Sequence, residues 1–142
     1  MSTLTLDSPS IASVPRAESV VGRIAEKNQV SGEEARRRLE ETLKFLSVAA
    51  RAEQPVSPPK AIDEAWHCFL VHTRSYQEYC TEQFGQFVHH RPTSGDEDDS
   101  REAYQRARTL AKRQFGTLDS SFWPRLGEGA GCKEGACTGE CD

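Results

Sequence analysis

The chain has 142 residues and a formal net charge of −4 at pH 7, and 36% of its residues are hydrophobic. This length favours one domain. The acidic balance argues against a general binder of nucleic acids or membrane surfaces, because such proteins usually carry a basic patch. No apolar run approaches the length that spans a bilayer, and the first ten residues lack the basic and apolar regions of a secretory signal. We therefore expect a cytoplasmic protein in which the five cysteines stay reduced.

The two ends of the chain differ in composition from the middle. Residues 1–17 are rich in Ser, Thr and Pro and lack helical periodicity, which predicts a disordered N-terminal tail. Residues 127–142 hold five of the ten glycines and three of the five cysteines, which predicts a flexible Gly/Cys-rich tail that is dispensable for folding. Residues 18–126 remain as the folded domain, and they are numerous enough to bury a modest core without cross-links.

Helical periodicity dominates the first half of this domain. A short helix is predicted over residues 18–28. Ser31 and Glu34 then form a capping box, in which each side chain binds the backbone of the other residue, and open a helix over 31–52. The apolar residues of that helix recur at steps of three and four and form one stripe: Ala35, Leu39, Leu43, Leu46 and Ala50.

Prolines and glycines divide the second half into three further helices. A proline-rich segment leads into a helix over 59–71, a helix over 73–84 ends at Gly85, and a helix over 98–115 follows an acidic loop. No segment shows sustained strand alternation, so the predicted fold is all-α: a small bundle of about five helices. Its predicted core residues are Leu39, Leu43, Leu46, Trp66, Phe69, Tyr104 and Phe115, and we expect residues 122–124 to pin the exit segment onto this core.

All four histidines, and two of the cysteines, fall within residues 67–90. Imidazole and thiolate are the side chains that bind zinc-like metals. We therefore predict a transition-metal site, zinc being one candidate, in which His67, Cys80 and at least one of His89 and His90 converge. Asp63 lies one helical turn before His67 and is a suitable hydrogen-bonding partner for a ligating imidazole. Tyr76, one turn before Cys80, is assigned the same outer role.

The C-terminal tail contributes further candidate ligands. Cys132, Cys137 and Cys141 are separated by short glycine-containing segments, and glycine permits the backbone to wrap closely around an ion. One of these thiolates would complete a set of four ligands around zinc. Three thiolates together would favour Zn(II), Cu(I) or an iron–sulfur cluster. The spacing of the histidines and cysteines matches no zinc-finger pattern, so residue type and not spacing carries the hypothesis.

Several of these residues also have purely structural interpretations. Trp66 has apolar neighbours and is expected in the core. His67 is equally compatible with a hydrogen-bonded buried histidine. Cys68 and Cys80 are both compatible with small buried hydrophobes, and this interpretation is favoured for Cys68. His72 suits the negative end of a helix dipole.

Five short motifs in this order carry a family resemblance: Ile62–His67, Thr73–Tyr76, Tyr79–Cys80, Phe84–Gly85 and His89–Pro92. Over roughly residues 18–124 the chain resembles the glycine-rich domain-containing protein family, although the long glycine tract of its larger members is absent. The resemblance implies a compact helical domain and implies little about activity. The polar residues that it carries over are Asp63, His67, Tyr76, Cys80, His89 and His90.

Three functional hypotheses follow. The leading one is a metal-binding protein with a structural or carrier role. The second is a metal-independent interaction module with a protein partner, and the third is a small metalloenzyme with an open coordination position. The sequence contains no clear nucleophile–base pair, phosphate loop or nucleotide fingerprint. It favours neither a nucleic-acid nor a membrane partner, and it does not give the oligomeric state.

Overall fold

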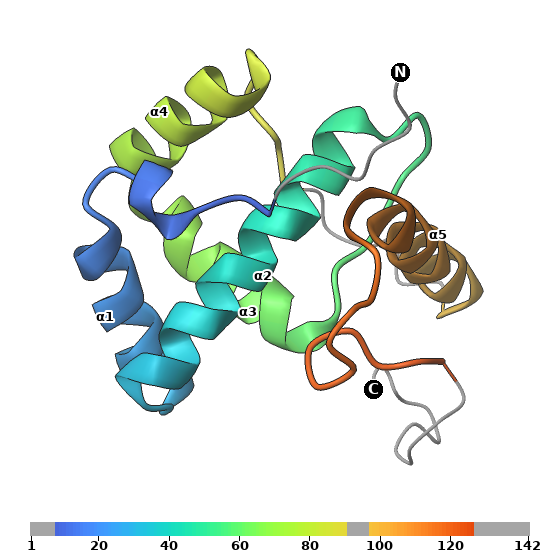
Figure 1. Cartoon of the computed structure of the whole chain (residues 1–142), viewed down its shortest axis with the longest axis horizontal. Coiled ribbons are helices and arrows are strands. Elements are labelled where there is room, and N and C mark those ends of the chain that lie inside the picture. Colours follow the sequence, from blue (N-terminus) through green and yellow to red (C-terminus); the bar gives the residue numbers. More distant parts are fainter. Residues whose placement is uncertain (1–7, 91–96, 127–142) are drawn as a thin grey trace.

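A computed structural model describes residues 8–90 and 97–126, the side chains of 97 and 98 excepted, and the account that follows is confined to them. This part of the chain is all-helical (Figure 1). Its elements are a short 3-10 helix η1 (Ile11–Ser13), α1 (Ala17–Asn28), α2 (Gly32–Arg51), α3 (Lys60–Leu70), α4 (Thr73–Phe84) and α5 (Glu97–Phe115). The predicted all-α class is confirmed. No helix within the described ranges is long and apolar enough to cross a membrane.

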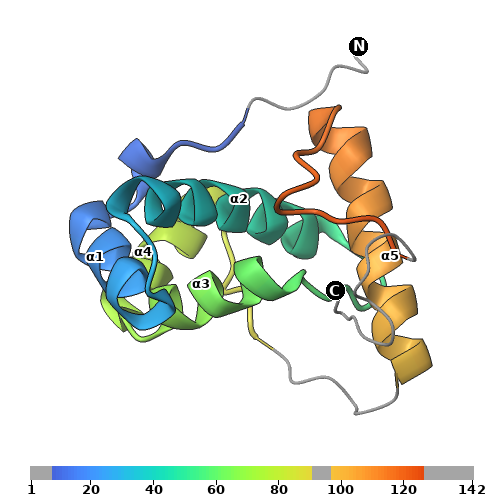
Figure 2. The ribbon, with the colours of Figure 1, turned by 90° about the horizontal axis from the view of Figure 1, so that it is seen from below.

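Helix α2 is the centre of the bundle. It packs against η1, α1, α3 and α5, while α3 also packs against α1 and α4. Figure 2 shows α2 and α3 as two stacked layers, with α5 crossing the end of the pair where α2 finishes and α3 begins. The segment between α2 and α3 is tied to α5 at this end, because the Arg106 Nε–H donates to the Pro55 carbonyl at 2.9 Å.

Local chemistry sets the helix ends. The Ser31 hydroxyl accepts a hydrogen bond from the Glu34 N–H at 3.0 Å, as the capping box predicts. The Glu34 carboxylate instead binds Arg38, one turn along the helix, at 3.2 Å, so only half of the box forms. Gly85 ends α4 with a φ of 69°, a left-handed conformation that costs glycine little.

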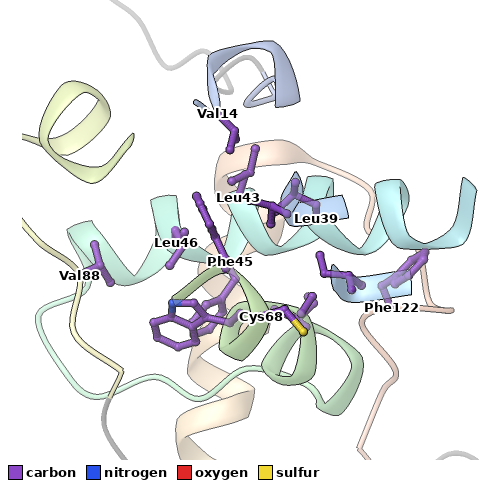
Figure 3. Packing of buried hydrophobic residues seen from close by; sticks show 14 of the residues in the cluster. Val14, Leu39, Leu43, Phe45, Leu46, Cys68, Val88 and Phe122 are labelled. Atoms are coloured by element: carbon purple, nitrogen blue, oxygen red, sulfur yellow. The ribbon is translucent and has the colours of Figure 1, made fainter. Parts of the chain in front are cut away.

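The core lies between α2, α1 and α3 and continues towards α5 (Figure 3). Six of the seven predicted core residues are buried, and Phe115 is half-buried beneath the Lys44 ammonium. The exit segment is pinned as expected: the Trp123 side chain is fully buried, and its Nε1–H donates to the Glu41 carboxylate at 2.8 Å.

The N-terminal boundary needs a correction. We expected a disordered tail over residues 1–17, yet its described part packs on the domain. Val14 is only 4% exposed, and η1 contacts α2. The Ser10 hydroxyl caps η1 by accepting from the Ala12 N–H. One buried valine directly after a three-residue helix leaves no periodic pattern, which is why the sequence did not predict it. Residues 1–7 and the predicted tail 127–142 lie outside the described residues.

Candidate metal centre

Two residues of α3 and one from the segment after α4 form a candidate metal-binding group. Asp63 and His67 lie one turn apart on α3. His90 lies six residues after Phe84, the last residue of α4. The His90 Nε2 lies 2.8 Å from the Asp63 Oδ1, and the His67 Nε2 lies 3.7 Å from the same oxygen. One ligand atom from each of the three residues lies within 4.8 Å of the other two.

These separations suit a shared ion. Zinc bonds to imidazole nitrogen and carboxylate oxygen are about 2.0–2.2 Å long, so neighbouring ligand atoms of a tetrahedral ion lie roughly 3.3–3.5 Å apart. The two distances to the Asp63 Oδ1, 2.8 and 3.7 Å, fall on either side of that value. The 2.8 Å contact is a hydrogen bond between His90 and Asp63, which an ion bound between these atoms would replace.

Ring contacts orient His90. Its imidazole centroid lies 4.3 Å from the Trp66 ring and 4.4 Å from the His67 ring. The His90 side chain is 19% exposed, whereas that of His67 is 56% exposed. The group therefore has one sheltered ligand and one ligand at the surface.

Burial alternates along the segment that carries His90. Val88 is buried, His89 is exposed and His90 is half-buried. The prediction left the choice between the two histidines open, and the structure brings His90, but not His89, to Asp63 and His67. The His89 ring instead packs on Phe87 with the centroids 4.7 Å apart.

A buried hydrogen-bond chain fixes Val88, two residues before His90. The Trp66 indole N–H donates to the Tyr76 hydroxyl at 3.0 Å, and that hydroxyl donates to the Val88 carbonyl. Trp66 thus supports His90 twice, through its ring and through this chain. Tyr76, which we had assigned to the surroundings of the ligands, acts on the backbone that presents a ligand.

Cys80 packs in the core, as its alternative interpretation as a small hydrophobe predicted, and not among the candidate ligands. Its side chain is fully buried, and it is not among the three residues whose ligand atoms cluster. Burial raises the pKa of the Cys80 thiol, although hydrogen bonding with the Val88 backbone and the Tyr76 side chain acts in the opposite direction. Cys80 therefore packs as a neutral thiol against the same chain that holds Val88.

The remaining candidates divide between structural positions and the undescribed tail. Asp63, predicted as an outer partner, has the carboxylate oxygen nearest to both histidines and so belongs with the candidate ligands. Cys68 is buried, and the His72 Nδ1 lies 3.1 Å from the Cys68 carbonyl at the end of α3, in line with their structural interpretations. The tail candidates Cys132, Cys137 and Cys141 lie outside the described residues.

Replacing Tyr76 by phenylalanine should destabilise the protein by about 2–4 kcal/mol, because the change leaves the buried Trp66 N–H and Val88 carbonyl without their partner. The urea midpoint measures this loss. Tyr79→Phe is the matched control, since Tyr79 is an equally buried tyrosine of α4 that takes part in neither bond. Equal midpoints for the two variants would contradict the importance of the chain.

Stability should also fall in alkaline solution. Burial raises the pKa values of two tyrosines and two cysteines, so the native state holds these four protons more tightly than the unfolded state does: Tyr76, Tyr79, Cys68 and Cys80. This contribution is fully present below the ordinary thiol pKa of 9.0 and is lost as the pH rises above it. The urea midpoint should therefore decline above about pH 9, and Cys80→Ala should flatten the first part of the decline. A midpoint that rises through this range would contradict the assignment.

Comparison with known proteins adds a family. The UCP032817-like family model matches residues 10–116. The chain belongs to the UCP032817-like family. The range of the UCP032817-like match includes η1, all five α-helices and the three candidate ligands, and it ends before Trp123 and the Gly/Cys-rich tail. No curated protein and no solved structure matches the chain.

Proposed function

We propose that this protein binds a divalent transition-metal ion, zinc foremost, through Asp63, His67 and His90, and that it has a structural or carrier role. The observation that carries the proposal is the mutual approach of three ligand atoms to within 4.8 Å. The ring contacts and the hydrogen-bond chain support it, because they hold the half-buried His90 in a fixed orientation over α3.

The chemistry of the three donor atoms limits which metal ions the group can bind. Two imidazoles and one carboxylate suit zinc and also ferrous iron, which proteins hold with the same combination. Soft ions such as Cu(I) prefer thiolates, and neither described cysteine belongs to the group. We therefore infer the class of metal ion from the nitrogen and oxygen donors of this group. We keep the tail thiolates of Cys132, Cys137 and Cys141 as proposed additional ligands.

A metalloenzyme is the second candidate function. Structural zinc sites use four protein ligands, whereas catalytic sites use three and keep a position for water. The group has three ligands, and the His67 side chain is 56% exposed, so solvent reaches the group from that side. The resemblance to glycine-rich domain-containing proteins stays a proposal that implies no particular reaction. The same holds for the cytoplasmic setting, which rests on the sequence alone.

Untagged full-length protein should bind one zinc ion per chain at Asp63, His67 and His90. Isothermal titration after removal of endogenous metal measures the stoichiometry and affinity, and elemental analysis identifies the metal that accompanies the protein from the cell. Absence of any saturable binding of zinc, ferrous iron or cobalt would overturn the proposal and would leave the metal-independent interaction module as the better hypothesis.

Binding of cobalt in place of zinc tests two questions separately: whether a tail cysteine is a ligand, and whether the bound ion has an open coordination position. The triple variant Cys132→Ser, Cys137→Ser, Cys141→Ser is expected to retain cobalt binding, because Asp63, His67 and His90 supply the site. A thiolate-to-cobalt absorption band that this variant loses would add a tail cysteine to the ligands. A visible spectrum that changes on addition of azide would indicate an open coordination position and would favour the metalloenzyme.

A further inference from the structure

A second candidate binding site borders Trp66. It is a cavity of about 750 Å³ bounded by the end of α2, residues 52–58, residues 86–89 and the first turns of α5. Trp66 borders this cavity and also packs on the His90 ring. Asp63, His67 and His90 are not among the lining residues, so the cavity is distinct from the proposed metal centre.

Four aromatic side chains border the cavity. Phe45 and Trp66 lie beneath it at 0% and 4% exposure, so Phe87 and His89, with ring centroids 4.7 Å apart, are the rings that a ligand can reach. Phe87 remains 42% exposed, and only Val71 is another large hydrophobic side chain so exposed among the described residues. A phenyl ring held at a cavity edge is a surface that a ligand can cover.

Carboxylates outnumber lysines and arginines among the described residues that line the cavity. Glu53, Asp99 and Glu102 line it, and Arg106 is the one lysine or arginine among the described lining residues. The Arg106 guanidinium donates to the Pro55 carbonyl, which holds α5 against the segment between α2 and α3. This charge balance disfavours an anionic ligand and favours a cation.

We propose that this cavity binds a small organic cation, an amine or a quaternary ammonium ion. Aromatic faces attract such cations through the ring quadrupole, and nearby carboxylates add Coulombic attraction. The volume admits a small molecule. The inference does not rest on metal binding at Asp63, His67 and His90, so it is tested with the metal removed by a chelator.

Choline and its uncharged isostere 3,3-dimethylbutan-1-ol are the probes. The two have the same shape and differ in charge, and each is titrated into full-length protein at constant ionic strength while the Trp66 indole N–H resonance is followed by NMR. Choline should bind about 5- to 30-fold more tightly than the alcohol, the range expected for a partly to fully desolvated cation–π contact. Equal affinities would overturn the proposal, as would the absence of saturable binding of choline.

Two pairs of variants locate the binding. Phe87→Ala and Glu102→Gln should each weaken choline binding by about threefold or more. Their matched controls, Val71→Ala and Glu40→Gln, alter exposed side chains that do not line the cavity and should change the affinity less than twofold. Glu102→Gln keeps the test decisive if Phe87→Ala disturbs the packing on Tyr76. Equal losses in cavity and control variants would overturn the assignment of the site.

Discussion

Replacing His90 by alanine should abolish stoichiometric zinc binding. The change removes the most sheltered of the three candidate ligands, whose Nε2 lies 2.8 Å from the Asp63 Oδ1. Loss of an outer-shell partner of a ligand typically costs about 10–100-fold in metal affinity, and loss of a ligand itself should exceed that range. Titration of zinc against a competing chelator measures the affinity.

His89→Ala is the matched control for this experiment, because His89 is the same residue type at the next position but is exposed and outside the group. His72→Ala and Cys68→Ala should likewise leave zinc affinity nearly unchanged. The two residues contact each other at the end of α3 and are outside the group of candidate ligands. A His89 variant that loses zinc while the His90 variant retains it would reverse our assignment of the ligand.

Replacing Trp66 by alanine should lower the free energy of unfolding by about 3–5 kcal/mol, the usual cost of deleting a large aromatic side chain from a core. Trp66 is 4% exposed, lies 5.3 Å from the Phe45 ring and supplies the donor to the Tyr76 hydroxyl. The urea midpoint, with the slope of the transition checked for two-state behaviour, measures the loss.

Val71→Ala provides the comparison, because Val71 directly follows the same helix and is 55% exposed. Its midpoint should stay close to that of the unaltered protein. Trp66→Ala should also weaken zinc binding under conditions where the variant is still folded, since the His90 ring loses the surface on which it packs. An unchanged urea midpoint for Trp66→Ala would contradict the packing described for α2 and α3.

The helices were predictable because local chemistry specifies them. The Ser31 cap, the three- and four-residue spacing of Leu39, Leu43 and Leu46, and the left-handed Gly85 each act over a few residues of the chain. The N-terminal contact of Val14 was not predictable in this way. It depends on a surface of α2 that exists only after the bundle has formed.

Only part of the candidate site was predictable from the sequence, because one of its residues comes from a distant segment of the chain. His67 and Asp63 share a helix face, which spacing alone predicts. The approach of His90 depends on the path of the segment after Gly85, and that path is set by the Trp66–Tyr76–Val88 hydrogen bonds. Apolar Val88 turned inwards could have indicated that His90, two positions later, faces the same side. The thiol of Cys80 was interpreted as a ligand because residue type does not reveal burial.

The proposed ligands come from two stretches of chain that are distant in sequence, α3 and the segment that follows α4. An ion held by His67 and His90 would therefore act as a reversible cross-link that closes the intervening loop and fastens α4 to α3. Because the unfolded chain does not preorganise this site, free metal at about 100 times the dissociation constant would add about 2.7 kcal/mol to the stability of the fold. The melting temperature of this small domain would then report the free metal concentration around it.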